Sequence, residues 1–105
     1  MEIEVLPRAE ADIIRQFRYY LVEQDAPLTA VRFRQAVIEG IKQVHTHSLI
    51  GSIVSGSIPG LRSWPVKGFV MIRIYYLRDP DSMRVVRVLH GSRNLRQILR
   101  REKLT

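Results

Sequence analysis

Two long runs rich in non-polar residues in the second half of the chain constrain its fold most. The first spans residues 69–77 and the second residues 83–94, and both are rich in β-branched and aromatic side chains. Residues 78–82 between them contain Asp-Pro-Asp, which is typical of a turn. The pattern therefore predicts a β-hairpin, preceded by a shorter strand over residues 61–66.

Side-chain alternation predicts how the two long strands pair. Even positions of the first strand are non-polar and Arg73 takes an odd one, so the even positions should form the core face. If Leu77 lies opposite Met83, Arg73 lies directly opposite Arg87. Because like charges facing each other across strands are destabilising, we expect either an anionic partner or both guanidinium groups extending into water. The predicted core face comprises Ile72, Ile74, Tyr76, Val86 and Val88.

The first half of the chain predicts a strand followed by two helices. Residues 2–6 alternate between polar and non-polar, and residues 8–24 carry non-polar side chains at helical spacing. The pattern resumes over residues 30–44 after a short link, which predicts an antiparallel helical hairpin. Gly40 lies inside the second helix, where glycine costs up to about 1 kcal/mol relative to alanine. Either a neighbouring element approaches closely there or the glycine is incidental.

The remaining segments complete a fold prediction. Residues 46–60 are rich in serine and glycine and predict a long surface loop, and residues 93–101 predict a short terminal helix. Together the elements predict one α+β domain over residues 1–105, ordered β-α-α-β-β-β(-α). In this domain the helical hairpin covers one face of an antiparallel sheet.

Charge and cysteine content narrow the class of protein. Lysine and arginine total 17 against 10 acidic residues, giving a net charge of +7. Guanidinium groups suit phosphate and carboxylate, so the expected partners are nucleic acid, a nucleic-acid-bound protein or an acidic polypeptide. The absence of cysteine excludes disulfides, thiolate catalysis and cysteine-based zinc sites. We expect a cytoplasmic protein that does not enter a membrane, because no non-polar run is long enough to span a bilayer.

Basic residues along the predicted hairpin are the candidates for target binding. They are Arg62, Arg73, Arg87, His90 and Arg93. RNA cleavage through the 2′-hydroxyl needs a general base, a general acid and cations on the scissile phosphate. A ribonuclease would use Arg62, Arg73, His90 and Arg93, but no residue is clearly placed as the base. No metal or cofactor is expected, because His45 and His47 project in different directions from a helix.

Several motifs, taken in order, resemble the RelE/ParE superfamily of bacterial toxins, the toxic halves of type II toxin–antitoxin pairs. They occupy residues 7–13, 30–33, 47–51, 61–62, 72–76 and 87–94. The superfamily's usual ending, His-Gly-x-Arg-Asp, is present as His-Gly-Ser-Arg-Asn over residues 90–94, so Asn94 lacks the usual charge. The resemblance covers nearly the whole chain and implies the α+β fold predicted above.

The superfamily divides by activity. RelE-branch members cut messenger RNA on the ribosome, whereas ParE-branch members are reported to poison DNA gyrase. This chain has no lysine within residues 56–60 and no tyrosine after Tyr76, departures that favour the ParE branch. The resemblance therefore implies a non-enzymatic gyrase inhibitor. The alternatives are a RelE-like, ribosome-dependent mRNA endoribonuclease and, given Asn94, a non-toxic binding module on the same fold.

An acidic antitoxin is the partner that both the charge and the resemblance predict. A basic surface with exposed Ile53, Val54 and Ile58 would suit an acidic amphipathic segment that folds as it binds. We therefore expect a hetero-oligomer with a cognate antitoxin. DNA gyrase is the second expected partner, with the ribosome and mRNA as the alternative.

Overall fold

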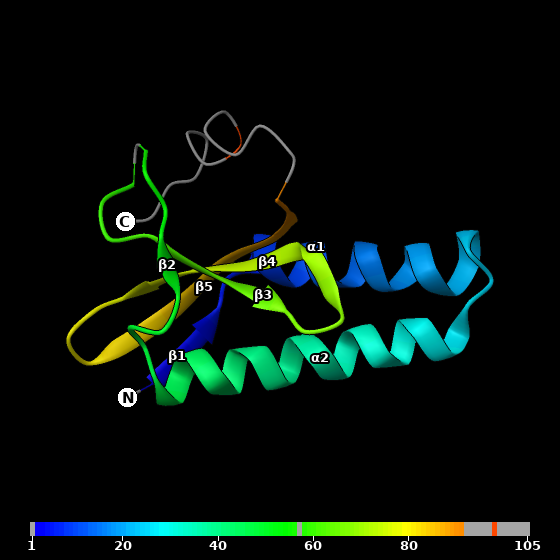
Figure 1. The fold of residues 1–105 in the computed structure, drawn as a ribbon, viewed down its shortest axis with the longest axis horizontal. Coiled ribbons are helices and arrows are strands. Elements are labelled where there is room, and N and C mark those ends of the chain that lie inside the picture. The colour runs from blue at the N-terminus through cyan, green and yellow to red at the C-terminus, as the bar shows by residue number, and fades with distance from the viewer. Residues whose placement is uncertain (1, 57, 92–97, 99–105) are drawn as a thin grey trace.

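The computed structural model describes residues 2–56, 58–91 and 98, and within them a five-stranded mixed sheet carries a helical hairpin (Figure 1). The strands are β1 (Glu2–Val5), β2 (Ser52–Ile53), β3 (Arg62–Val66), β4 (Phe69–Arg78) and β5 (Ser82–His90). Their order is β1-β5-β4-β3-β2, with β1 parallel to β5 and the other pairs antiparallel. The helices are α1 (Pro7–Arg18), continued by a π-helical turn η1 (Tyr19–Glu23), and α2 (Pro27–Thr46).

The predicted α+β class and the helical hairpin are confirmed, but the sheet is mixed rather than antiparallel throughout, because β1 pairs in parallel with β5. The predicted surface loop also contains β2, a short strand that the serine- and glycine-rich composition did not suggest. Arg93, Asn94 and all of the predicted terminal helix except Ile98 lie outside the described residues.

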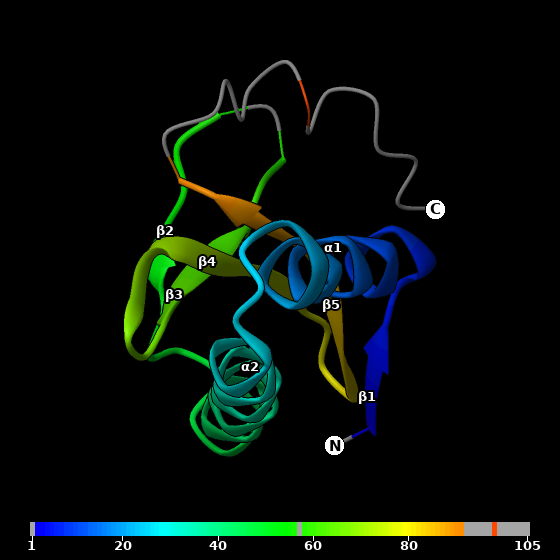
Figure 2. The same cartoon turned by 90° about the vertical axis from the view of Figure 1, so that its right-hand side faces the viewer.

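Proline and aromatic residues fix the helical hairpin. Pro7 and Pro27 each stand at the first position of a helix, where the missing N–H removes no hydrogen bond. At the tip of the hairpin, Tyr20 lies between Phe33 of α2 and Phe69 of β4, with ring centroids 5.6 and 5.5 Å away. These tilted ring contacts fasten the tip to the sheet. Figure 2 views the two helices nearly end-on.

The sheet is buried on both faces. The helix-side core combines the helices with one face of the sheet and contains Ala9, Phe33, Val37, Val66, Ile72, Ile74, Val85 and Val88. The far-side core contains Leu61, Tyr75, Leu77, Val86 and Leu89, and Leu6, Val54, Ile58 and Ile98 pack against it. The predicted core face on β4 is confirmed for Ile72, Ile74 and Tyr76, but the odd positions Tyr75 and Leu77 are buried as well.

The predicted register of the β4–β5 hairpin is wrong. Arg73 lies opposite Leu89, and Arg87 lies opposite Tyr75, so the two arginines do not face each other. The like-charge conflict expected from the sequence therefore does not arise across these strands.

Two local features displace the register. Asp79 donates its backbone N–H to the carbonyl of Ser82 (2.8 Å), so the turn is tighter than predicted. A β-bulge at Val86 then adds one further residue to β5. In consequence Val86 lies in the far-side core. Val85 takes the helix-side position that was predicted for Val86.

Gly40 marks a close approach between α2 and the sheet. This is the first of the two explanations that the sequence left open for this glycine. A Cβ atom at this position would stand 2.7 Å from Cδ1 of Ile74, which is completely buried. The missing side chain therefore sets how closely α2 packs on β4.

Candidate functional site

The candidate target-binding residues lie on three neighbouring strands. Arg62 is on β3, Arg73 on β4, and Arg87 and His90 on β5, whereas Arg93 lies outside the described residues. β4 lies between β3 and β5 in the sheet. The fold thus brings the arginines onto adjoining strands, and their individual contacts decide what each can do.

Arg62 holds the loop that follows α2. Its Nη1 donates to the carbonyl oxygens of Gly51 (2.7 Å) and Leu49 (3.2 Å). A guanidinium that satisfies two loop carbonyls in this way stabilises the connection between α2 and β2. Arg62 therefore has a structural role in addition to its predicted one.

Tyr76 fastens the same loop, a role that sequence reasoning missed. Its buried hydroxyl donates to the carbonyl of Ser48 and accepts the backbone N–H of Gly51, both at 2.9 Å. Burial raises the pKa of this hydroxyl, while the Gly51 N–H and the Arg62 charge act in the opposite direction. A Cβ at Gly51 would stand 2.5 Å from the hydroxyl oxygen, so a glycine is needed beside it.

Arg73 bonds to the neighbouring strand. Its Nε donates to Oγ of the buried Ser63 on β3 (2.9 Å). Arg73 is also close enough to Tyr75 to oppose the rise in the pKa of that hydroxyl, which burial causes. The Arg73 side chain is half-buried rather than extended into water.

Arg87 forms a buried ion pair with α1. Its Nε and Nη2 donate to the two carboxylate oxygens of Asp12, at 2.7 and 2.9 Å. The same carboxylate accepts the backbone N–H of Val88 (3.0 Å) and Nη2 of Arg15 (2.6 Å). The anionic partner expected for Arg87 is thus supplied by the protein itself.

Asp12 also completes the edge of the sheet. β1 pairs with β5 only as far as Val85, and Leu6 makes the last backbone hydrogen bond to that residue (3.0 Å). Beyond this point α1 lies beside β5, and Asp12 accepts the N–H of Val88 in place of a strand partner. The sequence signal was an acidic residue three positions after the buried Ala9, on the non-polar side of an amphipathic helix.

His90 ends β5 opposite Ile72 and is exposed. Arg62, Arg73 and Arg87 are each bonded to an acceptor within the protein. Among the described residues, no group of three or more His, Asp or Glu side chains could hold a metal ion.

The candidate antitoxin-binding residues are not equally accessible. Ile53 at the sheet edge is 69% exposed, as predicted. Val54 and Ile58 are half-buried and pack against the far-side core, so these parts of the loop lie over that face of the sheet. Their predicted exposure is therefore only partial, and their contact with an antitoxin stays a prediction.

Among the described residues, most of the exposed large non-polar side chains lie instead on the helical hairpin. Its exposed side chains are Ile14, Tyr19, Leu21, Val22, Leu28, Val31 and Ile38. Arg15 and Arg18 stand beside Ile14 and Val22 along a shallow groove on α1 and η1. Sequence reasoning assigned these helices to the core and overlooked a second non-polar stripe on their outer sides.

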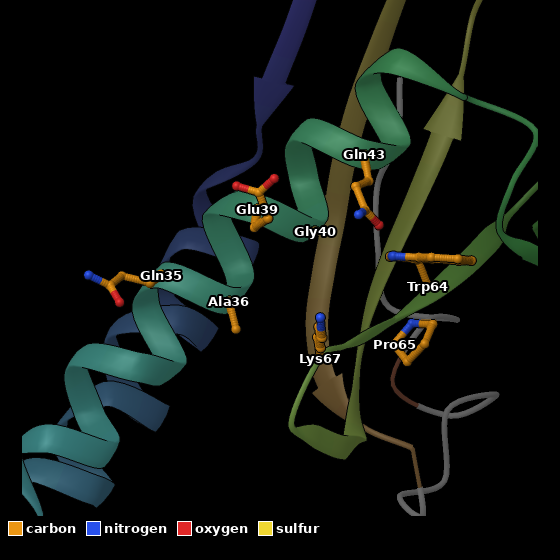
Figure 3. Close-up of a pocket in the computed structure, with 8 residues that line it drawn as sticks. All are labelled: Gln35, Ala36, Glu39, Gly40, Gln43, Trp64, Pro65 and Lys67. Atoms are coloured by element: carbon orange, nitrogen blue, oxygen red, sulfur yellow. The ribbon is translucent and has the colours of Figure 1, made fainter.

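A second groove runs between α2 and the outer edge of β3 (Figure 3). It has a volume of about 340 Å³ and is lined by Gln35, Ala36, Glu39, Gly40, Gln43, Trp64, Pro65 and Lys67.

No helix within the described residues is long and non-polar enough to cross a lipid bilayer.

Comparisons with known proteins point to one family. A family model described as the ParE toxin of type II toxin–antitoxin systems, parDE, matches residues 3–95. A solved structure described as the chromosomal ParDE TA system from P. aeruginosa shares the fold, with a TM-score of 0.72. The alignment covers 86% of this chain and 95% of that chain at 18% sequence identity. No curated protein sequence matches at a significant level.

Proposed function

Since the chain belongs to the family of ParE toxins of type II toxin–antitoxin systems, we propose that it inhibits DNA gyrase by direct contact and is neutralised by a cognate antitoxin. The inhibition involves no chemical step carried out by the toxin itself.

The observation that carries this proposal is the engagement of the arginines inside the fold. Arg87 is neutralised by Asp12, and Arg62 and Arg73 bond to loop carbonyls and to Ser63. Phosphoryl-transfer catalysis needs cations held ready for the phosphate and a base within reach of the 2′-hydroxyl. The carboxylates of Asp12 and Asp79 are each held by an arginine, Asp12 by Arg87 and Asp79 by Arg84. This arrangement supports inhibition by binding over RNA cleavage.

Charge and exposed non-polar surface support the antitoxin partner. The chain carries a net charge of +7, and Arg15 and Arg18 border exposed non-polar side chains on the helical hairpin. An acidic amphipathic segment would bury such non-polar side chains and place its carboxylates near the arginines. Ile53 on β2, the edge strand at the far end of the sheet from β1, offers a further non-polar contact.

The test compares two activities of the same purified protein. We expect the protein to inhibit gyrase supercoiling, and the antitoxin encoded by the adjacent reading frame to restore it. A parallel reaction with translating ribosomes should leave the mRNA intact. Site-specific mRNA cleavage without gyrase inhibition would establish the ribonuclease alternative.

Induced expression in cells gives an independent readout. Growth arrest with double-strand breaks and an SOS response agrees with gyrase as the target. Arrest with cleaved transcripts contradicts the proposal, and normal growth indicates a non-toxic binding module.

A further inference from the structure

The groove between α2 and β3 presents three hydrogen-bond donors around a non-polar floor. Figure 3 shows Gln43 projecting from α2 toward β3 and the indole nitrogen of Trp64 at the end of the ring nearest α2. Lys67 lies at one end of the groove, and Ala36, Gly40 and Pro65 supply non-polar lining. In the part of the chain that the structure describes, the side chains of Gln43, Trp64 and Lys67 make no hydrogen bond or ion pair. The donors are therefore available to a ligand.

The charge of the groove favours a single carboxylate. Lys67 is the one cation among the lining residues, and Glu39 lines the same groove. A dianionic phosphate would meet one ammonium group and one carboxylate, so its second charge would remain uncompensated. A carboxylate carries a single charge, so Glu39 opposes it less, and it can pair with Lys67 while accepting hydrogen bonds from Trp64 and Gln43.

The edge of β3 excludes one common mode of peptide binding. β2 covers β3 only at Arg62 and Ser63, and the next outward-facing position is occupied by Pro65, which has no N–H. A proline at a strand edge prevents a partner strand from extending the sheet. A polypeptide that binds in this groove must therefore do so through its side chains and not by backbone pairing with β3.

We propose that this groove binds one acidic side chain of the cognate antitoxin together with a neighbouring non-polar side chain. The carboxylate accepts hydrogen bonds from Lys67, Trp64 and Gln43, and the non-polar side chain lies against Ala36 and Gly40. A volume of about 340 Å³ is enough for these two side chains but not for a whole helix. The inference rests on the proposed function, because it assigns a binding site to the proposed partner.

Trp64 provides a direct probe, because it is the only tryptophan in the chain. Overlapping synthetic peptides that cover the antitoxin sequence, with phenylalanine in place of any tryptophan, are titrated against the full-length toxin. We expect a saturable change in Trp64 fluorescence with a peptide in which Asp or Glu adjoins a non-polar residue. Lys67→Ala should weaken that peptide by about tenfold, and Lys67→Arg should restore most of the affinity.

Lys42→Ala is the matched control. Lys42 is an exposed residue of α2 that does not line the groove, so this variant has the same net charge as Lys67→Ala. If both variants weaken peptide binding equally, the loss comes from the lower net charge of the protein and not from the groove, and the proposal is overturned. Lys67 lies in the exposed turn between β3 and β4, so its replacement should leave the fold intact.

Binding of the full-length antitoxin separates this inference from the proposed function. If the antitoxin binds and neutralises the toxin but no peptide alters Trp64 fluorescence, the groove assignment is wrong and the proposed function stands. If gyrase and not the antitoxin alters the fluorescence, the groove belongs to the target and the assignment is again wrong. If the antitoxin does not bind at all, both proposals fail.

Discussion

Asp12 and Arg87 form a two-point ion pair between α1 and β5, although they are 75 residues apart in the chain. The side chain of Asp12 is 1% exposed and that of Arg87 13%, so the pair is largely shielded from water. Because the same carboxylate also accepts the N–H of Val88, one side chain both holds α1 and completes the edge of β5. The helical hairpin therefore depends on a polar contact as well as on the non-polar core.

Replacing Asp12 with Asn should destabilise the protein strongly. The change removes the carboxylate charge that faces Arg87, and breaking a buried pair from one side costs about 3–5 kcal/mol. We expect the lower end of this range, because the Arg87 side chain keeps some contact with water. Urea unfolding followed by circular dichroism gives the free energy. Glu10→Gln, an exposed carboxylate of the same helix, is the control and should change stability little.

Replacing Gly40 with Ala should destabilise the protein despite the higher helix propensity of alanine. Alanine gains up to about 1 kcal/mol in a helix, whereas overpacking of a core costs about 1–3 kcal/mol. The new Cβ would stand 2.7 Å from Cδ1 of Ile74, which is fully buried. Adding Ile74→Val removes that methyl group, so the double variant should be more stable than the two single losses predict. Simple additivity would contradict the assigned contact.

Replacing Tyr76 with Phe should loosen the loop after α2. The change removes the hydroxyl that bonds both Ser48 and Gly51 and leaves two backbone groups to find other partners. Loss of such buried hydrogen bonds costs about 1–3 kcal/mol. Hydrogen exchange should accelerate at the Gly51 amide in particular. Tyr19→Phe, at a partly exposed tyrosine of η1, provides the comparison and should leave that amide unchanged.

Alkaline pH should destabilise the fold through Tyr75 and Tyr76. Burial raises the pKa of both hydroxyls above the ordinary value of 10.0. Above this pH the unfolded chain loses protons that the folded chain keeps, so the free energy of unfolding should fall as the pH rises. Below pH 10 the contribution is fully present. Unfolding measured between about pH 8 and 11 should show this decline, less steeply in a Tyr76→Phe variant.

Replacing His90 with Ala should leave growth arrest intact if inhibition requires no chemical step. His90 is exposed at the end of β5, so the substitution should not disturb the core. Induced expression and gyrase supercoiling measure the effect. Loss of both activities in a variant that remains folded would show that His90 acts in target binding or in a chemical step, and mRNA cleavage assayed on the same variant would separate the two.

The predictability of the site differs from residue to residue. Charge and position correctly located Arg62, Arg73 and Arg87 on neighbouring strands, because strand patterns are local in sequence. Their partners could not be predicted, because Ser63, Gly51 and Asp12 come from other segments. The exposure of Val54 and Ile58 was misjudged for a similar reason: a loop's composition does not reveal which face of a sheet it covers.

The sequence by itself determined the elements of this protein: helices from their 3.6-residue periodicity, strands from their β-branched runs, and the close approach at Gly40 as one of two possibilities. The tertiary structure decided the pairing. A tight turn at Asp79 and a bulge at Val86 shifted the hairpin by two residues, and hydrogen bonds between distant segments gave Arg87 its partner in Asp12. Periodicity is set by neighbours along the chain, whereas register and ion pairing depend on which surfaces meet once the chain has folded.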